Sequence, residues 1–193
     1  MLKPTEALLE CDPRFRGMVK LSPETGESRP MCMEDLWGLV ESVELHDSVP
    51  QSIRDQFDIA RNAFVYSWFV YEFASLAEKH SFTVLEMALR RRAHPEESPN
   101  TSRSPGLRRL LDAAKENGWL RAADFEMPSI SGSDGTMSRL DLLLQFRNHA
   151  LHGNVHLLPQ ETPTVLGLCA EVINKLFALP AHAGEAVTRD DQR

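Results

Sequence analysis

The stretch from Ala63 to Ala77, AFVYSWFVYEFASLA, constrains the fold of this chain more than any other. Glu72 is the single charged residue among its fifteen residues. A helix with apolar side chains on every face must be covered by protein on every face. We therefore predict a long helix that starts at Ser52, after Pro50, runs through this stretch and lies at the centre of the fold.

A membrane span is the competing interpretation of this stretch. A span needs about 18 to 20 apolar residues, and this stretch is shorter and is interrupted by Glu72. The N-terminus lacks the continuous apolar run of a secretory signal, and the cysteines (Cys11, Cys32 and Cys169) form no CxxC pair. We therefore expect a cytoplasmic protein without membrane contact.

Helical periodicity continues through most of the remaining chain, which predicts an all-α, compact helical bundle of about five to six helices. We expect helices over 33–45, from Ser81 as N-cap through 92, up to a C-cap at Gly118, from 136 or 137 to 152, and over 162–179. The organisation expected is an irregular N-terminal extension over 1–48, a helical domain over 49–179 and a disordered tail over 180–193. Within the extension, FRGMVKL could form a short edge strand.

The chain carries a net charge of −7, from 21 basic and 28 acidic residues, so its surface as a whole would repel nucleic acid. The segment from Arg90 to Arg121 reverses this sign, with eight basic and four acidic residues. It is either a solvated face or a local phosphate-binding surface. The candidate RNA-binding residues are Arg90, Arg91, Arg92, Arg108 and Arg109.

The helix that ends in QFRNHALHG, residues 145–153, changes character along its length. One face is apolar except for an arginine, and comprises Met137, Leu140, Leu143, Leu144, Arg147 and Leu151. The opposite flank is a polar stripe of Asp141, Gln145, Asn148 and His152. The helix thus begins as core and ends with functional groups.

Arg147 stands where a leucine is expected, and an arginine at the edge of a core needs an anionic partner. Two carboxylates stand at similarly apolar positions, Glu72 and Glu86. We predict that one of them, Glu86 rather than Glu72, lies within about 6 Å of the guanidinium and orients it. The alternative is that Arg147 extends along the surface to water.

His149, His152 and His156 have the spacing of metal ligands on one helix face. Gly153 and Asn154 should end the helix before His156, and no cysteine or carboxylate lies near in sequence to complete the shell. We therefore expect neither a metal nor another cofactor.

The run Arg147-Asn148-His149-Ala150-Leu151-His152 resembles the signature of HEPN domains, in which arginine and a polar residue are followed, after a short spacer, by histidine. The resemblance covers residues 49–179. It implies a helical bundle that forms a homodimer with two motifs facing one cleft, and in many members a metal-independent endoribonuclease of toxin, antiphage or RNA-processing systems. Other members bind nucleotides or partners without catalysis.

On this resemblance, Arg147, Asn148 and His152 are the candidate catalytic residues, and Glu86 and Glu72 are supporting. A histidine can move protons between a ribose 2′-hydroxyl and the leaving oxygen, while an arginine binds the charged phosphorane. The implied partners are RNA, a second copy of the chain, and an antitoxin or regulatory protein.

Two alternatives stay open: a noncatalytic binding or regulatory module, and a helical interaction protein in which the motif is coincidental. The dimer has separate support from aromatic residues that point in several directions: Phe64, Trp68, Phe69, Tyr71 and Phe73. We expect part of this face, or of the motif helix, to be buried between subunits.

Overall fold

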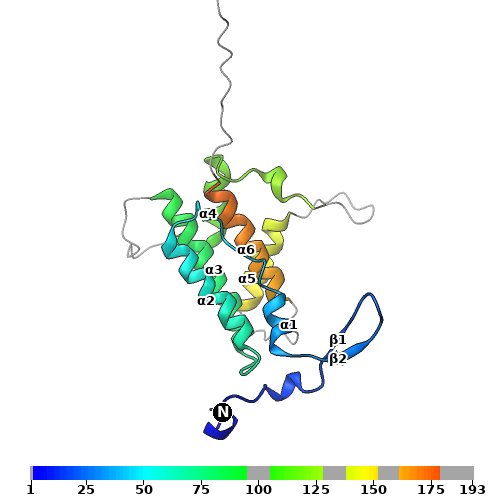
Figure 1. The fold of residues 1–193 in the computed structure, drawn as a ribbon. Coiled ribbons are helices and arrows are strands. Elements are labelled where there is room, and N and C mark those ends of the chain that lie inside the picture. Colours follow the sequence, from blue (N-terminus) through cyan, green and yellow to red (C-terminus); the bar gives the residue numbers. More distant parts are fainter. Residues whose placement is uncertain (1, 95–104, 128–137, 152–160, 179–193) are drawn as a thin grey trace, which may run out of the picture.

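The computed structural model describes residues 2–94, 105–127, 138–151 and 161–178. These residues are mostly helical and contain one small two-stranded sheet, which confirms the predicted all-α class. The helices described are α1 (Met33–Gly38), α2 (Gln51–Tyr66), α3 (Phe73–Ala93), α4 (Leu107–Glu116), α5 (Arg139–Leu151) and α6 (Thr162–Leu176). Figure 1 shows α2, α3, α5 and α6 side by side in one bundle.

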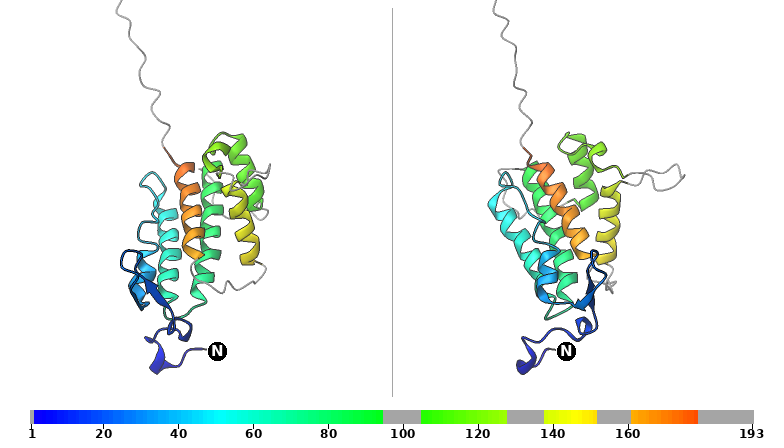
Figure 2. Two further views of the ribbon diagram at one scale, coloured as in Figure 1. Left: turned by 90° about the vertical axis from the view of Figure 1, so that its right-hand side faces the viewer. Right: turned by 45° about the vertical axis from the view of Figure 1, so that its right-hand side comes forward.

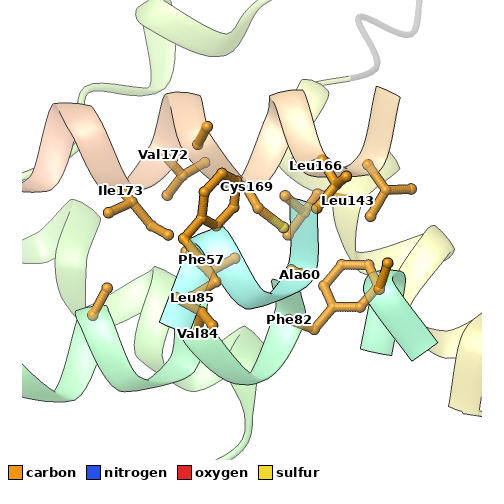
Figure 3. Packing of buried hydrophobic residues seen from close by; sticks show 14 of the residues in the cluster. Phe57, Ala60, Phe82, Val84, Leu85, Leu143, Leu166, Cys169, Val172 and Ile173 are labelled. Carbon is orange, nitrogen blue, oxygen red and sulfur yellow. The ribbon is translucent and has the colours of Figure 1, made fainter. Parts of the chain in front are cut away.

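α3 is the central helix, because it contacts α2, α4, α5 and α6. Its buried side chains, among them Val84 and Leu85, meet Phe57 of α2 and Ile173 of α6 in one core (Figure 3). Burying one such side chain contributes about 1.5–3 kcal/mol to folding. The core therefore fixes the position of α3, and with it the side chains that α3 presents to α5.

The predicted single helix from Ser52 through Ala77 is wrong. α2 ends at Tyr66, the chain turns, and α3 begins at Phe73 in the middle of the apolar stretch. β-branched and aromatic residues dominate the turn, and these residues favour a helix only weakly. Glu72 consequently lies exposed at the start of α3 and not inside an apolar helix.

The N-terminal segment covers this turn, which explains why the turn is apolar. Phe15 packs against Trp68 and Tyr71, with ring centroids 5.2 and 5.4 Å apart. The Asp12 backbone N–H donates to the Trp68 carbonyl, and the Asp12 carboxylate accepts from the Tyr71 N–H. Figure 2 shows the N-terminal segment at this end of the bundle. Phe64 and Tyr71 are thus buried within one chain, so they no longer argue for a subunit interface.

The predicted helix start at Ser81 is also wrong, because α3 runs unbroken past this residue. Ser81 is fully buried, and its hydroxyl donates to the carbonyl of Glu78 at 2.8 Å. A serine that bonds back to the preceding turn is compatible with a continuous helix. The same hydroxyl would mark an N-cap only if the chain entered the helix there.

Other expectations are met in part. α1 ends at Gly38 and is shorter than the predicted helix over 33–45. Beyond its end, the carbonyls of Val40 and Glu41 accept hydrogen bonds from Arg61. The expected edge strand exists as β1 (Val19–Leu21), and its partner β2 (Ser28–Pro30) was not predicted. α4 ends at Glu116 with Asn117 as its C-cap, and Gly118 follows with a φ of 71°, as expected for the glycine that stops the helix.

The predicted start of the motif helix at 136 or 137, its end at 152 and the tail over 180–193 lie outside the described residues. Phe15, Leu36 and Val40 of the N-terminal 48 residues belong to the same core as the bundle. Among the described helices, none is long and apolar enough to cross a membrane.

Candidate functional site

α5 carries the first five residues of the motif and packs against α3, and its apolar and polar faces are those predicted from the sequence. Leu140, Leu143 and Leu144 are buried against the core, and Asp141, Gln145 and Asn148 are exposed. The division of α5 into an apolar and a polar face is thus confirmed over its described residues. Arg147 lies at the edge of the apolar face, with its side chain 27% exposed.

Arg147 forms an ion pair with Glu86 of α3. Its terminal nitrogen donates to Oε1 of Glu86 at 3.0 Å, and the Glu86 side chain is only 17% exposed. The predicted pairing with Glu86 is confirmed, and the alternative in which Arg147 reaches water without a partner is wrong. Both residues lie on helices, so this ion pair links α5 to α3.

Glu86 also binds Arg90, one turn later on α3. Its second oxygen, Oε2, accepts from Arg90 at 2.9 Å, so each carboxylate oxygen meets a different arginine. The three side chains together carry one net positive charge. Arg90 also has a buried Nε without a hydrogen-bond partner among the described residues. This cluster of Glu86, Arg90 and Arg147, here called the arginine cluster, can attract a phosphate group.

Glu72 belongs to a different part of the molecule. It accepts a hydrogen bond from Arg14 at 2.7 Å, at the turn between α2 and α3, and its side chain is 58% exposed. The Arg14 guanidinium lowers the pKa of Glu72 below its usual value. The structure thus ties Glu72 to the N-terminal segment, whereas Glu86 is the carboxylate brought to Arg147.

The remaining motif residues are described only in part. Asn148 and His149 are exposed on the last turns of α5. His152 follows directly after Leu151, the last residue of α5, and lies outside the described residues together with His156. Within the described ranges, no three histidine, cysteine or acidic side chains form a group suited to a metal ion.

The predicted RNA-binding arginines lie on two helices in contact. Arg91 and Arg92 are exposed at the end of α3, and Arg92 lies over the ring of Trp119 at 5.7 Å. Arg108 and Arg109 are exposed in the first turn of α4, which packs on α3. In contrast to Arg90, none of these four arginines has an ion-pair partner in the described part of the chain.

Sequence reasoning missed a second carboxylate on α3. Glu78 is only 2% exposed and accepts a hydrogen bond from the hydroxyl of Thr162, the first residue of α6, at 2.6 Å. Glu78 and Glu86 stand eight residues apart, about 12 Å along one helix. The spacing of Glu78, Phe82 and Leu85 on a buried stripe could have revealed it, had 73–93 been recognised as one helix.

The arrangement offers a guanidinium paired with a carboxylate of α3, and exposed arginines at the end of α3 and the start of α4. A fixed guanidinium binds a planar or tetrahedral oxyanion with two parallel hydrogen bonds, and a second arginine on the same carboxylate adds to the positive potential. Comparison of the chain with protein families, with curated proteins and with solved structures gave no match in any of the three.

Proposed function

We propose that this protein is a metal-independent endoribonuclease of the HEPN type, with Arg147, Asn148 and His152 as its catalytic residues. The observation that carries the proposal is the ion pair between Arg147 and Glu86, at 3.0 Å. It supports a site in which the first residue of the RNxxxH motif is oriented by a carboxylate on the central helix. Few ordinary core positions on an apolar helix face hold a paired arginine.

In the proposed reaction, the 2′-hydroxyl of the substrate ribose attacks the adjacent phosphorus atom. His152 takes the hydroxyl proton and returns a proton to the 5′-oxygen as the bond from phosphorus to that oxygen breaks. The products are a 2′,3′-cyclic phosphate and a 5′-hydroxyl, so no water is consumed in this step. Arg147 binds the nonbridging oxygens, where negative charge accumulates in the transition state.

The proposal includes a homodimer in which the two motifs face one cleft. Arg91, Arg92, Arg108 and Arg109 are the residues proposed to bind the RNA backbone away from the cut bond. Their exposure and their lack of ion-pair partners among the described residues support this role. An acidic chain of net charge −7 can bind RNA when such a surface is local.

A noncatalytic role is the second candidate, and the same ion pair is compatible with it. The Arg147–Glu86 ion pair joins α5 to α3, so a purely structural function would also explain it. Under this alternative the protein binds a nucleotide phosphate or a partner at the arginine cluster without cleaving RNA. A toxin or antiphage role, with a neutralising partner, belongs to the catalytic proposal alone.

The test is cleavage of end-labelled single-stranded RNA by the purified protein at pH 6–8 in EDTA, with analysis of the product ends. Arg147→Ala and His152→Ala should each lower the rate by about 100-fold or more. Arg139→Ala is the matched control for the first variant, because Arg139 also lies on α5 and pairs with Glu171 at 2.9 Å. His149→Ala is the control for the second.

The composite site has its own test. If the cleft combines Arg147 of one subunit with His152 of the other, refolding the two inactive variants together should restore part of the activity. Binding of RNA without cleavage would favour the noncatalytic candidate. Equal cleavage by Arg147→Ala, His152→Ala and the parent would contradict the nuclease proposal.

A further inference from the structure

A groove of about 640 Å³ runs between α2 and α3, on a face that no other described element covers. Ile59, Ala63 and Tyr66 of α2 line one side. Phe73, Leu76, His80 and Thr83 of α3 line the other. We call this surface the α2–α3 groove. It is separate from the arginine cluster, whose residues do not line it.

The α2–α3 groove has the residue spacing that receives a helix. Among its lining residues on α2, Ile59, Ala63 and Tyr66 stand at intervals of four and three, with Asn62 beside them. On α3, Leu76, His80 and Thr83 repeat the same intervals. Helices pack on one another through residues at these intervals. From Phe73 to Thr83 the groove extends about 15 Å, which corresponds to about three turns of a bound helix.

The exposed apolar side chains of the groove are adjacent to one another and form a contiguous surface. Ile59, Tyr66 and Leu76 are 51%, 52% and 52% exposed, and they lie on the same open face. Contiguous apolar surface of this kind is typical of interaction sites. Other exposed apolar residues, such as Leu21 at 61%, lie on the N-terminal hairpin and do not line the groove.

The charge of the groove indicates the chemistry of its occupant. Its basic lining residues are Lys79 and His80, and its lining includes no carboxylate. Within the described residues Lys79 has no ion-pair partner. Two carboxylates that stand next to groove residues in the sequence are already paired: Asp58, which precedes Ile59, binds Arg61, and Glu72, which precedes Phe73, binds Arg14. A lysine that has no ion-pair partner among the described residues, in a lining without carboxylates, favours an acidic occupant.

We propose that the α2–α3 groove binds an amphipathic helix of a different protein, with apolar residues at intervals of three and four and carboxylates along the flank that meets Lys79. A second copy of this chain fits less well. A two-fold dimer pairs a surface with itself, so Lys79 and His80 would meet a lining that has no carboxylate. The inference does not depend on the proposed nuclease function.

Two synthetic peptides of sixteen residues serve as the probe for this site. Both place leucines at intervals of three and four, and they differ only in carrying glutamate or lysine on the flanks. Fluorescence anisotropy with the full-length protein should show saturable binding of the glutamate peptide, and binding of the lysine peptide about tenfold weaker or undetectable.

Three variants identify the binding surface. Leu76→Ser should weaken binding of the glutamate peptide about tenfold, while Leu21→Ser, a matched exposed leucine outside the groove, should leave it unchanged. Lys79→Glu should invert the preference between the two peptides. Circular dichroism of each variant verifies its fold, which should persist because these side chains lie on the surface.

Four results would overturn the inference. They are absence of binding by both peptides, equal binding of both, unchanged binding to Leu76→Ser, and self-association of the parent that is lost in Leu76→Ser. The last result would assign the groove to a second copy of the chain. RNA cleavage assayed on the same variants separates this inference from the proposed function, because loss of peptide binding should leave cleavage unchanged.

Discussion

Thr162 donates its hydroxyl to the carboxylate of Glu78 at 2.6 Å, at a point where both residues are almost completely buried. Thr162 is the first residue of α6, and Glu78 lies on the central helix α3. The hydrogen bond therefore fixes the start of α6 on α3. α3 also carries Glu86, whose carboxylate orients Arg147.

Thr162→Val should lower the free energy of unfolding by about 1–3 kcal/mol, because it removes a hydrogen bond from a buried carboxylate. Thr83→Val is the matched control. The Thr83 hydroxyl also donates to a protein oxygen, the carbonyl of Lys79, but the residue is exposed. Urea denaturation measures both variants, and equal losses would contradict the structural role of the buried pair.

Phe15→Ala should destabilise the protein by about 3–5 kcal/mol. Phe15 is 1% exposed and packs between Trp68 and Tyr71, so its removal opens a cavity over the turn between α2 and α3. Leu21→Ala, on the exposed hairpin, should change the stability by less than about 0.5 kcal/mol. A small effect of Phe15→Ala would mean that the N-terminal segment is not part of the core.

Asp12→Asn should destabilise the protein by about 2 kcal/mol at pH 7. Hydrogen bonds from Arg14, above all from its side chain, and from the Tyr71 N–H lower the pKa of Asp12 to about 2. A lowered folded-state pKa stabilises the fold at pH values above the unfolded pKa of about 4. This contribution is lost as the pH falls toward 2.

The difference in stability between the parent and Asp12→Asn should therefore shrink as the pH falls from about 5 to about 2. Guanidinium titrations at fixed pH steps measure this difference. The exposed Asp55→Asn provides the control, since the Asp55 carboxylate binds only Gln51 on the same helix among the described residues. A difference that does not change with pH would exclude ionised Asp12 as its source.

Glu86→Gln should reduce RNA cleavage, if the proposed function is correct, by at least about tenfold, because a neutral amide holds Arg147 less firmly. Glu171→Gln breaks a second ion pair of α5, with Arg139, and should leave cleavage near the parent rate. Thermal unfolding of both variants shows whether the two losses in stability are comparable. Full activity in Glu86→Gln would limit Glu86 to a structural role.

Cys169 should resist alkylation by iodoacetamide until the protein unfolds. The residue is fully buried, and burial raises the pKa of its thiol to about 12, which leaves almost no thiolate at neutral pH. Cys11 and Cys32 are partly exposed and provide internal references. Mass spectrometry of each peptide over time measures the rates, and early labelling of Cys169 would contradict its position in the core.

The helices that the sequence predicts well are those with a narrow apolar stripe and clear end signals. Two examples are the apolar stripe of α6 from Val165 to Leu176 and the glycine stop of α4 at Gly118. Each signal depends only on residues that are close together in the sequence. Periodicity and capping are local properties, so they can be recognised without knowing what covers the element. The two faces of α5, and with them the unusual place of Arg147, follow from the same local pattern.

Contacts between distant residues decided the rest. The chain turns at 67–72 because Asp12 and Phe15, more than fifty residues earlier, bind and cover that turn. In the sequence, a run of apolar residues looks the same for a covered turn and for a buried helix.

The partner of Arg147 shows both what the sequence determines and what it leaves open. The sequence by itself determined that this arginine needed a carboxylate and narrowed the choice to two, because an ionised group at the edge of a core must be paired. Only the packing of α5 on α3 decided for Glu86, by bringing residues 61 positions apart to 3.0 Å, while the turn after α2 directed Glu72 to Arg14.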